Sequence, residues 1–172
     1  MTYRYLWLSL LVIITVSVPV RAEVIQVIVE SRTPFASDVP DKVGPYERIR
    51  GRVVYALDPN HEANQAIVDL SLAATNGEGL VEFYADFEII APVDRRLAKR
   101  TVLYDVNNRG NPTCLATISS GGDHFLMREG YILVFSGWIA ELLPNGRNLV
   151  LDAPVATSGG EPIRGLVRSE IV

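Results

Sequence analysis

Histidine, cysteine and basic residues are scarce in this sequence, and each scarcity excludes a class of protein. The 172 residues include one cysteine, Cys114, and two histidines, His61 and His124. A single cysteine forms no internal disulfide, and two distant histidines with one cysteine do not make a zinc signature. Lys and Arg number 16 against 20 Asp and Glu, whereas nucleic-acid binding needs a basic face. No glycine-rich phosphate loop or dinucleotide fingerprint is present. The sequence therefore predicts no metal, no cofactor and no nucleic-acid partner.

The N-terminus has the layout of a secretory signal peptide. Arg4 precedes an apolar run from Leu6 to Val18, and small residues at Val20 and Ala22 suit a cleavage site. The run is shorter than the roughly 20 residues that span a bilayer, so an uncleaved anchor is the weaker alternative. We expect residues 1–22 to be removed, leaving no stable membrane span and a secreted or periplasmic protein. The remaining chain, residues 23–172, has 14 basic and 20 acidic residues, a net charge of −6, and the length of one domain.

Strand patterns dominate the first half of this domain. From Val81 to Ile89, apolar and polar residues alternate, which predicts an antiparallel strand with one face in water. Glu82, Asp86 and Glu88 would lie on that solvated face. Further strands are predicted at Val24 to Val29, Ile49 to Leu57 and Ile67 to Leu72.

The pattern changes after Pro92. Thr101 to Val106 and Tyr131 to Phe135 are short apolar runs separated by a predicted helix from Phe125 to Glu129. Two-sided apolar runs joined by a crossover are typical of parallel strands inside a sheet. Two more strands are predicted in the tail, at Leu149 to Val155 and Ile163 to Ile171.

Several stretches in order resemble the N-terminal part of a family of bacterial α/β-hydrolase domain-containing proteins. They are GPYERIRGRVVYALDP, IVDLSLAATNGEGLVEFYADFEIIAP, TVLYDVNNRGN, FLMREGYILVFSGW and APVATSGGEPIRGLVRSEIV. The resemblance implies an α/β, β-rich fold in which antiparallel N-terminal strands lead into the first parallel strands of an α/β-hydrolase-like sheet. It also implies that the parent activity is hydrolysis of an ester or related acyl bond in a small molecule.

The catalytic residues of that family have no counterpart in this chain. The nucleophile of an α/β-hydrolase stands in a Gly-x-Ser-x-Gly elbow and is followed by an acid and a histidine. No serine here has glycine at both positions, and the last histidine is His124. We therefore expect an exported front portion that is inactive alone, with a C-terminal hydrolase piece or a second copy as its partner.

The resemblance marks three residues for a site. Asn108 and Gly110, in the NNRGN stretch, would contribute backbone N–H groups to an oxyanion loop. The structural alternative is a tight turn in which Arg109 holds a neighbouring carboxylate or a loop carbonyl. Trp138 would line a substrate pocket, and its alternative role is that of a packed core aromatic.

A second hypothesis comes from a different class of protein. The chain would then be a non-catalytic secreted module, either a pseudo-enzyme or a β-rich domain that binds a ligand or partner. An incomplete hydrolase should leave an open parallel strand edge with exposed apolar surface. A genuine small domain should cover that edge with its own tail, Leu149 to Val172.

Overall fold

A computed structural model describes residues 23–36, 42–119 and 123–166 of the chain. The predicted signal peptide lies outside these residues. The described part contains eight strands, two α-helices and three 3-10 turns: β1 Glu23–Phe35, β2 Tyr46–Leu57, β3 Val81–Pro92, β4 Val102–Asp105, β5 Ile132–Ser136, β6 Leu151–Asp152, β7 Thr157–Ser158, β8 Glu161–Pro162, α1 Cys114–Ile118, α2 Phe125–Arg128, and turns at Glu62–Asn64, Leu70–Leu72 and Arg95–Leu97.

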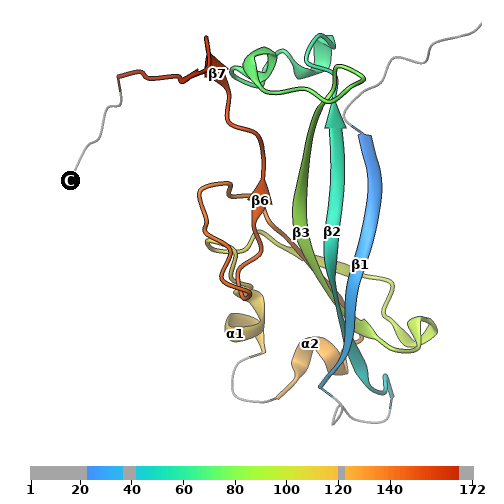
Figure 1. Cartoon of the computed structure of the whole chain (residues 1–172). Helices are drawn as coiled ribbons and strands as arrows, with labels where there is room; N and C mark the ends of the chain where they lie inside the picture. The colour runs from blue at the N-terminus through green and yellow to red at the C-terminus, as the bar shows by residue number, and fades with distance from the viewer. Residues whose placement is uncertain (1–22, 37–41, 120–122, 167–172) are drawn as a thin grey trace, which may run out of the picture.

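The main sheet is mixed and is dominated by three long strands. Its order is β1-β2-β3-β5-β4, and the short β6 also pairs with β3. Strands β1, β2 and β3 form an antiparallel meander, and they stand side by side in Figure 1 with α1 and α2 near their lower end. Strand β5 pairs antiparallel with β3, while β4 and β5 run parallel. The strands β7 and β8 form a separate two-stranded sheet.

The predicted fold class, an α/β-hydrolase-like sheet, is wrong. Such a sheet is built from repeated parallel strand and helix units, but β4 and β5 are the one parallel pair in the described part of the chain. The described part of the crossover between them, residues 106–119 and 123–131, contains α1 and α2, which have five and four residues. The physical reason is that β5 inserts between β3 and β4 and pairs antiparallel with β3, so the sheet stays largely antiparallel.

The individual strand predictions have mixed outcomes. The five predicted runs at residues 24–29, 49–57, 81–89, 101–106 and 131–135 all lie in or overlap strands of the main sheet. The predicted strand from Ile67 to Leu72 is instead a loop that ends in a 3-10 turn. In the tail, only Leu151–Asp152 of the first predicted strand is extended and paired. The second predicted strand is not formed over residues 163–166, and its remainder lies outside the described residues.

The main hydrophobic core lies between the sheet and the two short helices. Ile90 on β3 and Leu133 and Phe135 on β5 are fully buried there and pack with Leu126 and Met127 of α2. Tyr46 at the start of β2 joins this core, and its hydroxyl lies 3.0 Å from the carbonyl oxygens of Met127 and Tyr131. The crossover therefore attaches to the antiparallel meander through a buried, hydrogen-bonded aromatic side chain.

The predicted solvated face of β3 is partly wrong. Glu82 is exposed, but Asp86 is half-buried and Glu88 is only 1% exposed. Glu88 stands opposite Phe135 of β5 and opposite Arg50 of β2. Strand β5 covers one side of the carboxylate, and two arginines neutralise its charge. Glu88 is therefore buried, although the alternating pattern of β3 predicts that it is exposed to solvent.

Candidate functional site

The segment after β4 is a tight turn tied to the neighbouring strands. Arg109 and Gly110 have φ angles of +48° and +76°, and Asn108 and Asn111 form an antiparallel bridge. The guanidinium of Arg109 donates to the Glu141 carboxylate at 2.7 Å. This is the turn, with a carboxylate held by Arg109, that the sequence offers as the structural alternative to an oxyanion loop.

Both predicted oxyanion donors are used within the turn itself. The Asn108 N–H donates to the Asn111 carbonyl at 3.1 Å, and the Gly110 N–H donates to the side-chain oxygen of Asn107 at 3.1 Å. An oxyanion hole needs N–H groups that point toward the reacting oxygen. In this conformation neither amide is available, so the oxyanion role of Asn108 and Gly110 stays a prediction that requires the turn to rearrange.

Asn107 is the organising residue of the turn, and the sequence analysis did not single it out. Its side chain is 1% exposed, and its amide nitrogen donates to the Ser136 carbonyl at 2.7 Å. Its own carbonyl accepts the indole N–H of Trp138 at 2.9 Å. These bonds join the carboxyl ends of the parallel strands β4 and β5. A polar residue directly after the apolar run from Thr101 to Val106 is the signal that would have identified it.

Trp138 is therefore not a packed core aromatic. Half of the residue, 51%, is exposed, and its indole nitrogen is anchored to the turn. The structure brings Trp138 next to the turn that carries Asn108 and Gly110. Its role in lining a substrate pocket stays a prediction.

The single cysteine is buried against a carboxylate. Asp105, the last residue of β4, accepts the backbone N–H groups of Thr113 at 2.8 Å and Cys114 at 2.9 Å. It thereby satisfies two free donors at the start of α1. Burial, followed by the negative charge of Asp105, raises the pKa of the Cys114 thiol to about 12. A thiol that stays protonated at neutral pH is a poor nucleophile.

A ladder of charges crosses β2 and β3 on the face that carries Tyr46 and Ile90. Glu88 accepts Nε–H donors from Arg48 at 2.9 Å and from Arg50 at 2.6 Å. Arg52, the next arginine on this face, pairs with Glu30 at 3.2 Å and with Asp86 at 3.5 Å. A carboxylate is costly to bury without partners, so Glu88 can be buried only because the two guanidinium groups offset its charge.

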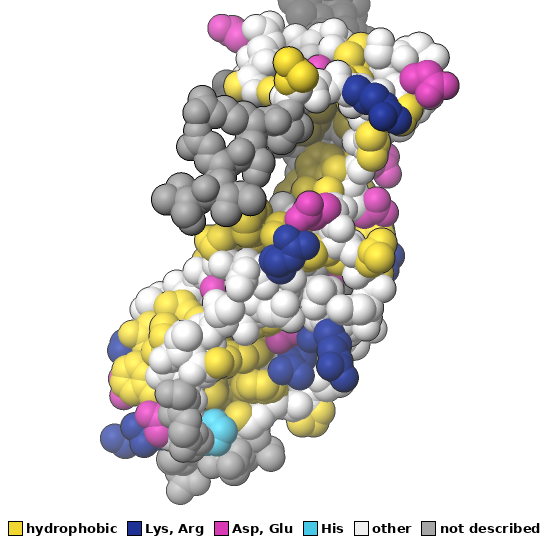
Figure 2. Space-filling view, turned by 90° about the vertical axis from the view of Figure 1, so that its left-hand side faces the viewer, with side chains coloured by type: hydrophobic (Ala, Val, Ile, Leu, Met, Phe, Trp, Pro, Cys, Tyr) yellow, Lys and Arg dark blue, Asp and Glu magenta, His cyan; other side chains and the backbone are white. Residues whose placement is uncertain are grey.

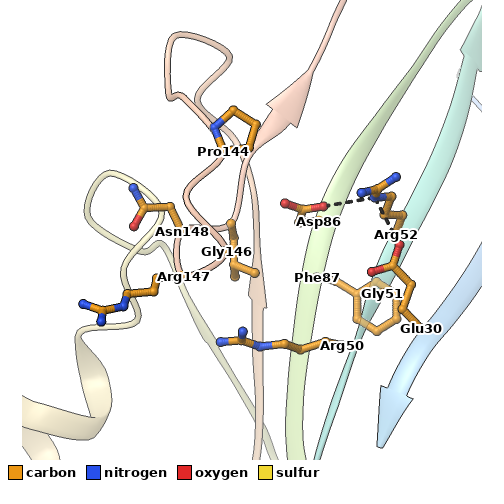
Figure 3. Close-up of a pocket in the computed structure, with 11 residues that line it drawn as sticks. Glu30, Arg50, Gly51, Arg52, Asp86, Phe87, Pro144, Gly146, Arg147 and Asn148 are labelled. Atoms are coloured by element: carbon orange, nitrogen blue, oxygen red, sulfur yellow. Dashed lines mark ion pairs between the residues drawn. The ribbon is translucent and has the colours of Figure 1, made fainter.

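Two pockets accompany this framework. One, of about 210 Å³, lies between the charge ladder and the loop at residues 144–149, and Figure 3 shows it in close-up. The other, of about 260 Å³, is mostly apolar and lies between the ends of β2 and β3, the segment at residues 67–73 and the tail at residues 151–156. Figure 2 shows hydrophobic side chains at the surface in a recess halfway up this side and again at the level of α1 and α2.

The described ranges contain no group of three or more His, Cys, Asp or Glu side chains that could hold a metal ion. Within the same ranges, no helix is long and apolar enough to cross a membrane. Comparisons with protein-family models, with curated proteins and with solved structures gave no match. The geometry of the chain is therefore the basis for assigning a function.

Proposed function

We propose that this chain is a non-catalytic part of a larger exported protein whose sheet continues beyond β4. The observation that carries the proposal is the open edge of β4. Within the described residues no strand pairs with its outer side, and Val102, Tyr104 and Val106 are 57%, 54% and 67% exposed. Parallel strands are normally buried within a sheet, and proteins rarely leave an apolar strand edge uncovered.

Over residues 149–166, the part of the tail that the structure describes, the tail does not cover this edge. Its strand β6 pairs with Tyr84 and Ala85 of β3, and β7 and β8 pair only with each other. A self-contained small domain should place its own tail on the open edge. The arrangement thus supports an incomplete sheet more than a finished module.

The proposed activity of the complete protein rests on the sequence resemblance. It is hydrolysis of an ester or related acyl bond by a serine that lies outside this chain. The chain would supply the turn after β4 and Trp138, and it would be inactive alone. Export to the periplasm or the medium, with removal of residues 1–22, belongs to the same proposal.

The second candidate is a non-catalytic secreted module that binds a ligand. The observation that favours it is the apolar pocket of about 260 Å³, since apolar cavities of this kind commonly take small molecules. Its volume is slightly below the usual range for ligand pockets, so this candidate comes second.

The coding DNA beyond the codon for Val172 tests the proposal. We expect one of the three frames to encode a Gly-x-Ser-x-Gly elbow followed by an acid and a histidine. Co-expression of that segment with this chain should give a soluble complex that hydrolyses p-nitrophenyl acetate, while the chain alone should not. If no frame encodes such a segment and the chain is a soluble monomer, the proposal fails and the binding module replaces it.

A further inference from the structure

The pocket beside the charge ladder contains a surplus of positive charge in an acidic protein. It lies between β2, β3 and the loop at residues 144–149, and its volume is about 210 Å³. Arg50, Arg52 and Arg147 line it together with Glu30 and Asp86. Some of these charges are neutralised by a neighbouring side chain and others are not.

The two carboxylates of the pocket wall are both committed to Arg52. Glu30 lies 3.2 Å and Asp86 3.5 Å from the Nε of that arginine. Asp86 also accepts the backbone N–H of Val150 at 3.1 Å through its other oxygen. In Figure 3 this ion-paired group stands on one side of the pocket, apart from the guanidinium of Arg50.

Arg50 is held in place by a buried partner that it shares. Its Nε lies 2.6 Å from Glu88, and Nε of Arg48 lies 2.9 Å from the other oxygen of the same carboxylate. Two guanidinium groups on one carboxylate leave one positive charge unmatched. Arg50 extends from β2 toward the loop that carries Gly146 (Figure 3), and within the described residues its terminal amino groups have no hydrogen-bond acceptor.

The loop opposite Arg50 is fixed and carries a second unmatched charge. Asn145 accepts the backbone N–H groups of Arg147 and Asn148 at 2.9 Å each, and the Leu149 N–H donates to the Gly110 carbonyl at 3.0 Å. Arg147 is exposed, and its guanidinium has no ion-pair partner among the described residues. Arg147 lines the same pocket as the preorganised Arg50, and in Figure 3 its exposed side chain points away from Arg50. Guanidinium groups are suited to oxyanions, because their planar fork matches oxyanion geometry.

We propose that this pocket binds a small ligand through an oxyanion group, a carboxylate or a phosphate, held by Arg50 and by Arg147 after the exposed Arg147 side chain turns toward the pocket. Asn148 supplies a neutral donor from the same loop, and Pro144 and Leu149 offer apolar contact to the body of the ligand. The pocket and the adjoining ladder hold four arginines, Arg48, Arg50, Arg52 and Arg147, against three carboxylates, Glu30, Asp86 and Glu88, which leaves a surplus of one positive charge. The bound anion reduces that surplus. This site is formed by the charge ladder and the loop at residues 144–149, and it is independent of the proposed hydrolase activity.

Titration of the full chain with sodium phosphate and, separately, with sodium acetate tests this inference. The readout is the NMR shift of the backbone amides at residues 146–148 and of the Arg50 Nε–H, at constant ionic strength set with sodium chloride. We expect saturable shifts at these positions with at least one of the two anions. The anion that binds more tightly identifies the preferred ligand group.

Two variants of equal charge make the test specific. Arg147→Ala should weaken binding about threefold to fivefold, the effect of one partly exposed charge pair. Arg164→Ala removes the same charge from the exposed tail and should leave the affinity unchanged. Arg50→Lys keeps the charge without the planar fork and should also weaken binding; if it does not fold, the Arg147 and Arg164 pair decides.

Three results would overturn the inference. Shifts that rise linearly with either salt show only general screening of the surface. Equal weakening in the Arg147 and Arg164 variants shows attraction to net charge rather than to a site. Saturable shifts confined to residues outside the pocket place the anion elsewhere.

Discussion

Single residues determine the local structure at two positions, one with a buried charge and one with a positive φ angle in a crowded turn. Glu88 is buried between β2 and β5 and depends on Arg48 and Arg50. Gly110 combines a left-handed backbone with close contact to Asn148 and Leu149, which lie far along the chain. Both positions can be tested by one substitution and a matched control.

Replacing Glu88 with glutamine should lower the free energy of unfolding by about 2 kcal/mol. Breaking a buried ion pair costs more than this, but the two arginines are each about one third exposed and recover hydration. Urea unfolding measures the change. Glu129→Gln, which breaks an exposed pair with Lys99, should change it by less than about 0.5 kcal/mol. Equal effects of the two variants would contradict the role given to Glu88.

Replacing Gly110 with alanine should be more destabilising than replacing Gly146. Both glycines have φ angles near +75°, so each substitution carries a backbone cost of about 1 kcal/mol. At Gly110 the added Cβ would also lie 2.6 Å from the Leu149 carbonyl oxygen, whereas at Gly146 it meets nothing within 4 Å. We expect a loss of about 3 kcal/mol at Gly110 and about 1 kcal/mol at Gly146 in thermal or urea unfolding. A Gly110 variant as stable as the Gly146 variant would show that the turn shifts freely.

At the scale of elements, the crossover between β4 and β5 is held by side chains more than by its own helices. The helices α1 and α2 have only five and four residues, too few to be stable in isolation. Asp105 fixes the start of α1, and the hydroxyl of Tyr46 meets the carbonyl that follows α2. The residue pattern predicts this crossover and a short helix from Phe125 to Glu129, which overlaps α2, but it does not predict α1.

Replacing Asp105 with alanine should loosen the start of α1. It removes the acceptor of the Thr113 and Cys114 amides, at a cost of about 1 kcal/mol in the free energy of unfolding. Asp105→Asn keeps one carbonyl oxygen and should lose less. Hydrogen exchange at the amides of Thr113 and Cys114 should accelerate in the alanine variant and less in the asparagine variant. Unchanged exchange in both would contradict the capping role.

The free energy of unfolding should fall at alkaline pH because a buried phenol and a buried thiol ionise less readily in the folded chain than in the unfolded chain. Burial raises the pKa of Tyr46 from 10.0 to about 12, and burial with the charge of Asp105 raises that of Cys114 from 9.0 to about 12. Ionisation then favours the unfolded chain, so the free energy of unfolding is unaffected below about pH 9 and declines from there to about pH 12. Urea midpoints between pH 7 and pH 11 measure this.

The thiol gives a separate readout of the same burial. Native Cys114 should resist iodoacetamide at pH 8 to 9 and react promptly in urea. Cys114→Ala should remove the part of the alkaline loss that begins near pH 9 and leave the part due to Tyr46. Rapid alkylation of the folded chain would contradict both the burial and the raised pKa.

At the scale of the whole molecule, the described main sheet has two edge strands, β1 and β4, and the proposed continuation of the sheet lies at β4. An uncovered apolar edge promotes pairing with another polypeptide, and a lysine on such an edge prevents it. We expect the isolated chain to self-associate and Val102→Lys to reduce light scattering. Val155→Lys places the same charge at a residue that is 78% exposed in the tail and should have little effect. If both variants scatter light equally, association does not proceed through β4.

The sequence alone specified the long strands, because alternating and β-branched runs bury one face of a sheet wherever they pair. It also indicated the turn after β4 and the absence of a nucleophile elbow. It did not specify that β5 pairs antiparallel with β3, since a two-sided apolar run fits either direction. Nor did it indicate that Glu88 is buried, because its partners Arg48 and Arg50 lie about 40 residues away. Strand order and the neutralisation of distant charges are decided by contacts between segments, and these exist only in the tertiary structure.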